Sequence, residues 1–279
     1  MVSVKFAAIA GVATVIATVA NAADMPQLLP PVHAPPIEEA TGWYLRGDIG
    51  FSNQKVDSVE YVPGPGEAAL TSQQTVAAGF DTAGIFGLGV GYSFNAWLRA
   101  DVTGEYRGNA NYRGQNIITS GGNTYAEQDF GSKSEWVVLA NVYADLGTWW
   151  SVTPFVGVGV GASYNRISNF QDIVLTSTTG PLLANNFYDE NAKWNFAWAL
   201  HGGLAYKVTP QLTLELAYRY IDLGDALSGA ASSWNAGGAT GHQKFNHLTS
   251  HDVRFGLRWM LEPPAPVQPY VLPPLMRRG

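Results

Sequence analysis

The sequence predicts an all-β fold, an eight-stranded antiparallel up-and-down transmembrane β-barrel. Eight segments alternate apolar and polar residues with a period of two, which is typical of β-strands. The connections between these segments are alternately long and short, and aromatic residues gather near both ends of the segments. An even number of strands, long outer connections, short periplasmic turns and two aromatic belts together are typical of bacterial outer-membrane barrels.

The first segment, residues 41–54, places Trp43, Leu45, Ile49 and Phe51 on one face and puts Arg46 and Asp48 on the other. The next two segments form a hairpin around Asn95-Ala96. In residues 84–94 large apolar side chains alternate with Gly and Ser, and in residues 97–107 apolar side chains alternate with charged ones. The apolar face of each segment is therefore expected to point in one common direction.

The charges on this hairpin decide that direction. Arg99, Asp101, Glu105 and Arg107 share one face. A packed soluble core could hold them only with full pairing, and each arginine on a lipid-facing surface would cost ~2–4 kcal/mol at mid-membrane. We therefore expect the charges to face a narrow barrel lumen and the apolar side chains to face lipid.

The other five strands follow the same pattern. Residues 135–146 carry Trp and Val on the expected lipid side, and residues 152–165 alternate Val with Gly. Residues 193–207 and 211–221 alternate aromatic or Leu residues with smaller or charged ones, and residues 247–260 end in a run that alternates Arg with apolar side chains. Between the strands, long polar loops are expected near residues 55–81, 108–134, 166–192 and 222–246.

The remaining sequence predicts where the protein is delivered. Residues 1–22 have Lys5, an apolar run and Ala20-Asn21-Ala22, as expected of a cleaved signal peptide. An N-terminal anchor is the alternative, but the apolar run is shorter than the ~20 residues that a spanning helix needs. Residues 23–40 and 261–279 are Pro-rich and are expected to be a periplasmic linker and tail on either side of a barrel at residues 41–260. The expected location is the outer membrane.

Composition excludes several classes of function. The chain has no Cys, so it has neither disulfides nor cysteine-ligated metals, and it cannot use a cysteine nucleophile. Its net charge is −6 and it has no basic run, which argues against a nucleic-acid partner. The runs Gly87-x-Gly89 and Gly157-x-Gly159 are not dinucleotide fingerprints, because strand alternation explains them as space-making positions in the lumen.

The main candidate site is a polar network in the lumen. Its expected role is structural, since an eight-stranded interior is just wide enough for side chains to fill. A gated ion path is the alternative. The network is expected to contain Arg46, Asp48, Arg99, Asp101, Glu105, Arg107, Glu215, Arg219, Asp252, Arg254 and Arg258.

Histidines supply a second, weaker candidate. His242, His247 and His251 lie near the start of the last strand, and His247 and His251 would share a face. They could ligate haem or a metal, or they could simply lie at the lipid headgroup boundary, which is the reading we favour. Ser250-His251-Asp252 resembles a catalytic triad only in order, because neighbouring strand residues point to opposite faces. We therefore expect no enzyme activity, no cofactor and no metal.

Several motifs resemble the small outer-membrane β-barrel proteins of the alphaproteobacterial porin-like family, which include surface antigens and haem-binding members. The resemblance lies in Ala23-Asp24 before a Pro-rich stretch and in four short motifs, which are residues 41–51, 153–157, 217–224 and 251–257. The chain differs from the family at Ala40, where a Trp is usual, and after Met260, where members usually end on an aromatic residue. The resemblance implies an eight-stranded barrel related in architecture to the transmembrane domain of OmpA, and it implies no particular ligand.

Three functions remain open at this point. The expected one is a structural, surface-exposed outer-membrane protein that contributes to envelope integrity and presents long loops. The alternatives are a protein that binds haem or another ligand and a small low-conductance porin. The expected partners are outer-membrane lipids, lipopolysaccharide and the barrel-assembly machinery, with possible periplasmic contact through the Pro-rich tails.

Overall fold

The computed structural model describes residues 41–67, 70–178, 180, 184–233 and 240–261. The predicted signal peptide, the linker at residues 23–40 and the tail after Leu261 lie outside these residues. Within them the strands are β1 (Gly42–Val62), β2 (Ser72–Phe80), β3 (Ala83–Ser93), β4 (Leu98–Ser120), β5 (Asn123–Asp145), β6 (Val152–Ser177), β7 (Ala184–Tyr188), β8 (Asn191–Lys207), β9 (Leu212–Leu227), β10 (Ala231–Ser233) and β11 (His242–Met260). This part of the chain offers no helix of the length and apolarity that a membrane crossing requires.

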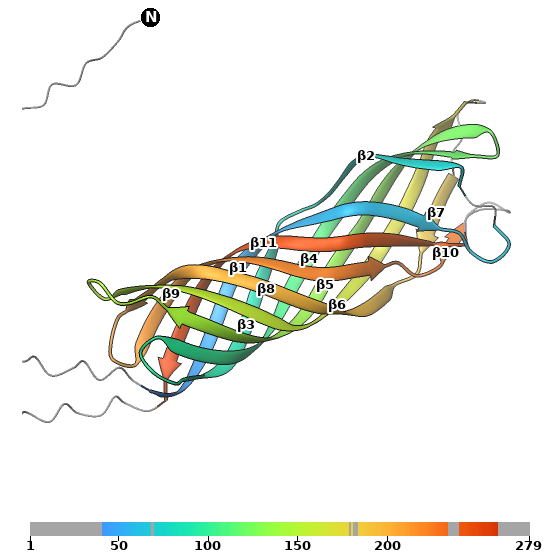
Figure 1. Cartoon of the computed structure of the whole chain (residues 1–279). Helices are drawn as coiled ribbons and strands as arrows, with labels where there is room; N and C mark the ends of the chain where they lie inside the picture. Colours follow the sequence, from blue (N-terminus) through green and yellow to red (C-terminus); the bar gives the residue numbers. More distant parts are fainter. Residues whose placement is uncertain (1–40, 68–69, 179, 181–183, 234–239, 262–279) are drawn as a thin grey trace, which may run out of the picture. The chain divides into compact units, whose positions relative to one another are not determined.

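Eight of these strands form a closed antiparallel ring, which confirms the predicted fold. Going round the ring, the order is β1, β3, β4, β5, β6, β8, β9 and β11. The ring closes where β11 pairs with β1, for example Phe255 opposite Ile49. Figure 1 shows these strands as a barrel, with the short strands β2, β7 and β10 toward one end. Closure leaves the membrane part of the barrel without a free strand edge, as a lipid environment demands.

The apolar side chains point outward and the charged ones inward, as the alternation predicted. Leu88 is 75% exposed, whereas Arg107 and Arg219 are fully buried. Aromatic side chains mark the outer boundary of the apolar surface. Direct strand neighbours form a continuous row there, in the order Phe86, Tyr106, Trp136, Tyr164 and Trp194. We call these five residues the outer aromatic row.

The expectation of long loops was wrong for most of the residues concerned. β4 continues from Tyr106 in the outer aromatic row to Ser120, and β5 returns from Asn123 after a tight turn at Gly121-Gly122. β6 likewise continues to Ser177. At about 3.4 Å per residue, β4 adds roughly 45 Å of strand beyond the row. The wall of the barrel therefore extends beyond the membrane, and we call this part the outer extension.

The short strands belong to the outer extension. β2 pairs with β4, β7 pairs with β6, and β10 pairs with β7. Side chains complete the contact between β1 and β2, because the Gln73 amide accepts from the Tyr61 backbone N–H and donates to the Val59 carbonyl. The extension is thus a hydrogen-bonded sheet rather than a set of separate loops.

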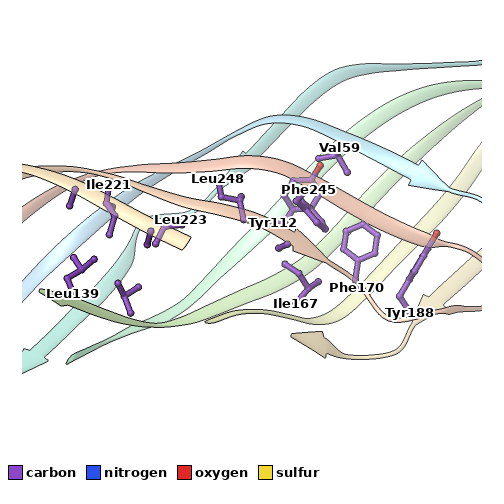
Figure 2. Packing of buried hydrophobic residues seen from close by; sticks show 14 of the residues in the cluster. Val59, Tyr112, Leu139, Ile167, Phe170, Tyr188, Ile221, Leu223, Phe245 and Leu248 are labelled. Carbon is purple, nitrogen blue, oxygen red and sulfur yellow. The ribbon is translucent and has the colours of Figure 1, made fainter. Parts of the chain in front are cut away.

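The lumen is not polar throughout, which is a second departure from the prediction. A cluster of buried apolar residues lies inside the barrel and includes Leu139, Ile221, Phe170 and Phe245. Figure 2 shows the cluster extending along the interior from Leu139 and Ile221 toward Phe170 and Tyr188. At its outer end the Phe245 ring packs edge-on against Tyr112 and Phe170, with ring centroids 5.2 and 5.7 Å apart. A buried apolar core therefore fills part of the lumen, in addition to the charged residues.

Glycines on the inner face make room for large lumen side chains. A Cβ at Gly157 would overlap the Tyr143 ring, whereas a Cβ at Gly87 would meet Glu105 at 3.4 Å, an ordinary contact. Gly157→Ala is therefore expected to lower the free energy of unfolding by about 1–3 kcal/mol through overpacking. Urea unfolding in detergent micelles, followed by intrinsic fluorescence, would measure this loss.

The matched control is Gly87→Ala on the same barrel face, which is expected to change stability far less than Gly157→Ala. Equal effects of the two substitutions would contradict the proposed role of Gly157 as a space-making residue.

Candidate functional site

The lumen holds a network of ion pairs between the periplasmic end and the outer aromatic row. Ten of the eleven predicted network residues are buried, and Arg258 is half-buried. Ion pairs within 4 Å join all eleven and add three further residues. The seven cations are Arg46, Arg99, Arg107, Lys133, Arg219, Arg254 and Arg258, and the seven carboxylates are Asp48, Asp101, Glu105, Glu135, Asp145, Glu215 and Asp252. The network is therefore balanced in charge.

Arg46 is the central residue near the periplasmic end. Its guanidinium donates to both oxygens of Asp48 and to Asp101, the latter at 2.7 Å. It also donates to the Tyr143 hydroxyl at 3.0 Å. One side chain on β1 thereby connects to β4 and β5 across the lumen, which stiffens the closed ring.

Arg99 uses aromatic rings as well as carboxylates. Its guanidinium carbon lies 4.2 Å from the centre of the Tyr143 ring and 4.8 Å from that of Phe155. Its Nε donates to Asp145 at 3.2 Å. One terminal nitrogen lies 3.4 Å from Glu215. Neither terminal nitrogen has a hydrogen-bond acceptor among the described residues, so stacking on both rings helps to stabilise this buried guanidinium.

Arg219 and Arg107 form the outer part of the network. Arg219 donates to both oxygens of Glu105, at 2.6 and 2.8 Å, and also to Asp252. Arg107 donates to both oxygens of Asp252, at 2.8 and 3.0 Å. Arg254 connects this outer part of the network to the part around Arg46, because it lies 3.0 Å from Asp48 and 3.7 Å from Glu105. These bidentate pairs join β4, β9 and β11 through the middle of the barrel.

Three members of the network were missed by the sequence reasoning. Asp145 pairs with Arg99, while Glu135 pairs with Arg107 and Lys133. Asp145 and Glu135 lie on the inward face of a predicted strand, so the alternation itself could have found them. Lys133 lies in a segment that was expected to be a loop, and only recognition of the longer strand would have placed it in the lumen.

The histidines do not form a ligand set. Both ring nitrogens of His247 lie within hydrogen-bond distance of carboxylates, Asp57 at 2.7 Å and Asp222 at 2.8 Å, and these contacts raise the pKa of His247. The ring of His251 instead contacts the Tyr218 hydroxyl on the outer surface. His242 is half-buried and is the first residue of β11. No group of three His or acidic residues in the described part of the chain could hold a metal ion.

The backbone at His247 explains why it departs from the simple alternation. The register of β11 against β9 shifts between Phe245 and Leu248, and His247 has a positive φ of 52°. A β-bulge here redirects the side chain. The adjacent Ser250-His251-Asp252 keeps its alternation, with Ser250 and Asp252 bonded inside the barrel. His201 is the one buried histidine among those that the structure describes, and it contacts the Asn141 amide at 3.2 Å.

The geometry defines the class of protein. A closed ring of eight antiparallel strands, apolar outside and salt-bridged inside, is a β-barrel of the bacterial outer membrane. The chain belongs to the family of outer membrane protein β-barrel domains, whose family model matches residues 10–260. The outer membrane is therefore where this protein resides.

The chain is also similar to individual proteins. The Brucella abortus protein BAB2_0314 is 31% identical over 86% of this chain and 92% of its own length. A protein of Rickettsia typhi designated an adhesin, RT0816, is 26% identical over 78% of this chain and 87% of its own length. Among solved structures, Neisserial surface protein A is similar over 78% of this chain and 97% of its own, with 16% identity and a TM-score of 0.44.

Proposed function

We propose that this protein is a non-conducting, surface-exposed structural barrel whose outer extension serves as a contact surface of the cell. The outer extension is the observation that carries the proposal. Strands β4 and β5 continue as a paired hairpin from the outer aromatic row to Ser120 and Asn123. A paired β-hairpin keeps its outward-facing side chains in fixed positions above the membrane. Such a surface suits attachment, and a stiff barrel anchored in lipid and lipopolysaccharide suits a role in envelope integrity.

The filled lumen supports the non-conducting part of the proposal. The side chains of the charge-balanced network and of the apolar cluster are both buried in the interior. We therefore expect the purified protein to produce no stepwise increases of conductance in a planar lipid bilayer. A general porin that is purified in the same way and measured at the same voltages serves as the positive control. Stepwise openings that persist after removal of contaminating porins would support the small-porin alternative instead.

The attachment role draws support from the Rickettsia typhi relative, whose designation is adhesin. The outer faces of β4 provide a test, because Arg113 and Ile117 are both exposed there. Cells that display Arg113→Ser/Ile117→Ser are expected to adhere to cultured animal cells several-fold less than cells that display the unchanged protein. Retained bacteria would be counted after washing, at equal surface abundance of the two proteins.

The matched control for this test is Lys207→Ser/Val208→Ser, which removes a cation and an aliphatic residue that are exposed at the opposite end of the barrel. Adherence of this control is expected to equal that of the unchanged protein. If neither double variant alters adherence, the face of the β4 extension that carries Arg113 and Ile117 is not an attachment surface.

The haem-binding alternative has less support from the geometry. His247 is engaged by two carboxylates and His251 by Tyr218, so each ring already has polar partners of its own. A ligand-binding role would have to use other residues of the outer extension.

A further inference from the structure

The alternation of inner and outer residues is interrupted on three neighbouring strands, β1, β11 and β9, where the membrane barrel passes into the outer extension. Strict alternation puts two residues an odd number of positions apart on opposite faces of a strand. Each of these strands nevertheless has two buried residues that are an odd number of positions apart. The pairs are Gln54 and Val59 on β1, Ser250 and Phe245 on β11, and Leu223 and Ala226 on β9. All three strands are therefore irregular between the members of their pair.

His247 occupies the irregular position on β11. Its φ of 52° lies in the left-handed region, and Asp57, the residue opposite it on β1, is left out of the ladder between the two strands. On β9 the irregular position is Gly224, whose φ is 69°. A residue larger than glycine keeps a left-handed backbone only where surrounding contacts hold it there. The contacts of His247 therefore help to hold the bend in β11.

His247 contacts both strands that flank β11. Its Nδ1 lies 2.7 Å from a carboxylate oxygen of Asp57 on β1, and its Nε2 lies 2.8 Å from a carboxylate oxygen of Asp222 on β9. Its backbone N–H also donates to the Asp225 carboxylate on β9 at 3.0 Å. An ionised carboxylate only accepts hydrogen bonds, and a neutral imidazole has a single N–H to donate. Both ring contacts can be hydrogen bonds at once only when each ring nitrogen carries a proton.

We propose that His247 is a pH-sensitive clasp that fastens β1, β11 and β9 together at the base of the outer extension. With both ring nitrogens protonated, the ring donates to Asp57 and to Asp222. When one proton is lost, the bare nitrogen faces a carboxylate oxygen, and two acceptors cannot bond, so one strand is released from the ring. On its other side the outer part of β1 is joined to β2 through the Gln73 side chain and not through a strand ladder among the described residues. The outer extension therefore loosens along β1 as the pH rises.

The direction of this pH effect follows from the partners of the ring. The hydrogen bonds with Asp57 and Asp222 raise the pKa of His247 above its ordinary value of 6.5. The contribution of the clasp is therefore complete below about pH 6.5 and is lost as the pH rises through the raised pKa. The His247 side chain is half-exposed, and water screens its ion pairs. We expect a local change in mobility rather than unfolding of the barrel.

Other charged or titratable groups lie on the strands around His247. They are Lys55 and Asp57 on β1, Tyr220, Asp222 and Asp225 on β9, Lys193 on β8, and Lys244 and His251 on β11. Lys193 and Lys244 lie 3.6 and 4.0 Å from Asp225, so this carboxylate has cationic partners of its own. Within 4 Å, His247 is the cation that reaches Asp57 and Asp222 in the described part of the chain.

Spin labels can report on the clasp because the chain has no cysteine of its own. The whole protein, refolded in detergent, would carry a nitroxide at Glu60→Cys, an exposed position on β1 beyond Asp57. The label is expected to become more mobile as the pH rises from 6 to about 9, with a midpoint above 6.5, and to recover when the pH is lowered. The matched position is Gln115→Cys, which is exposed on β4, a strand that does not neighbour β11, and its label should change far less.

Nitrogen NMR of histidine-labelled protein would measure the protonation of His247 directly, with His247→Gln to assign its signals. Both ring nitrogens should be protonated at pH 6, and the ring should titrate above pH 6.5. The Asp57→Asn/Asp222→Asn variant keeps the side-chain sizes and removes both carboxylates. In this variant the titration of His247 should move down toward 6.5, and the label at residue 60 should be mobile at every pH tested.

Two comparisons separate the clasp from other titrating groups. On β5, burial raises the pKa of Glu127 to about 8 and that of Asp129 to about 7, so these carboxyls change charge over the same range. A pH response at residue 60 that persists in Asp57→Asn/Asp222→Asn would come from such groups and would overturn the proposal. Constant mobility at residue 60, or a His247 titration at or below 6.5, would overturn it as well. The matched control is His251→Gln on the same strand, which should keep the full response because the His251 ring contacts Tyr218 instead.

Discussion

Replacement of Arg219 by methionine is expected to destabilise the barrel by about 3–5 kcal/mol. The Arg219 guanidinium is fully buried and binds both oxygens of Glu105 and one of Asp252. Methionine has a similar length but no charge, so Glu105 and Asp252 would lose a shared partner in the interior of the barrel. The removal of one partner from a buried ion pair is costly because the remaining charge stays buried.

The measurement is the urea midpoint of refolded protein together with heat-modifiable mobility on a gel. The folded Arg219→Met barrel should unfold at a lower urea concentration and at a lower temperature than the unchanged protein. A second variant, Arg219→Met with Glu105→Gln, should recover part of the lost stability because it removes one of the two carboxylates that Arg219→Met leaves without that partner. This second variant separates the loss of charge compensation from a mere loss of packing.

Arg166 provides a matched control. It also binds a glutamate through two nitrogens, at 2.6 Å each, but both side chains are about half-exposed. Water already solvates such a pair, so Arg166→Met should leave the urea midpoint nearly unchanged. If Arg219→Met and Arg166→Met behaved alike, the lumen network would not stabilise the barrel.

The sequence was sufficient to predict the membrane part of the fold because lipid imposes a sharp contrast between the two faces of a strand. In β3 and β4, Leu88 and Val102 meet lipid while Glu105 and Arg107 meet the lumen, and this contrast produces the period of two. The eight strands of the ring, their antiparallel order and the inward charges all follow from this single pattern.

The same contrast disappears above the membrane, which is why the outer extension was mistaken for loops. Around Tyr112 the sequence reads Asn111-Tyr112-Arg113-Gly114-Gln115-Asn116, with Tyr112 and Asn116 inside and Arg113 and Gln115 outside. Water on the outer face allows polar residues there, and the lumen also accepts polar residues such as Asn116. A strand that is polar on both faces has no hydrophobic period to detect.

The lumen itself was only half predictable for a related reason. Charged residues on the inner face were recognised because they would be costly in lipid. Leu139 and Ile221 are just as deeply buried, but an apolar residue is equally compatible with either face of a membrane strand. The buried Asp129 and Asp172 were missed for another reason, since they become neighbours only through the pairing of β5 with β6.

Phe245→Ala is expected to lower the free energy of unfolding by about 3–5 kcal/mol, the range found when a buried phenylalanine is reduced to alanine. The Phe245 side chain is fully buried and contacts the rings of Tyr112, Phe170 and Phe80. These rings come from β11, β4, β6 and β2, so the cavity would loosen the outer extension from several sides at once. Urea unfolding would measure the total loss.

Limited proteolysis would show where the Phe245→Ala loss acts. Cleavage should increase between the outer aromatic row and Ser120 while the membrane strands stay protected, because the lower salt-bridged network does not depend on Phe245. The control is Phe86→Ala, which removes the same ring from a side chain that is 61% exposed on the lipid-facing surface and should therefore cost less. Equal losses, or cleavage spread evenly through the barrel, would contradict the assignment of a separate apolar core to the outer extension. If the loss of stability and the new cleavage sites are confined to the outer extension, the extension is stabilised by its own packing and not by the membrane barrel alone.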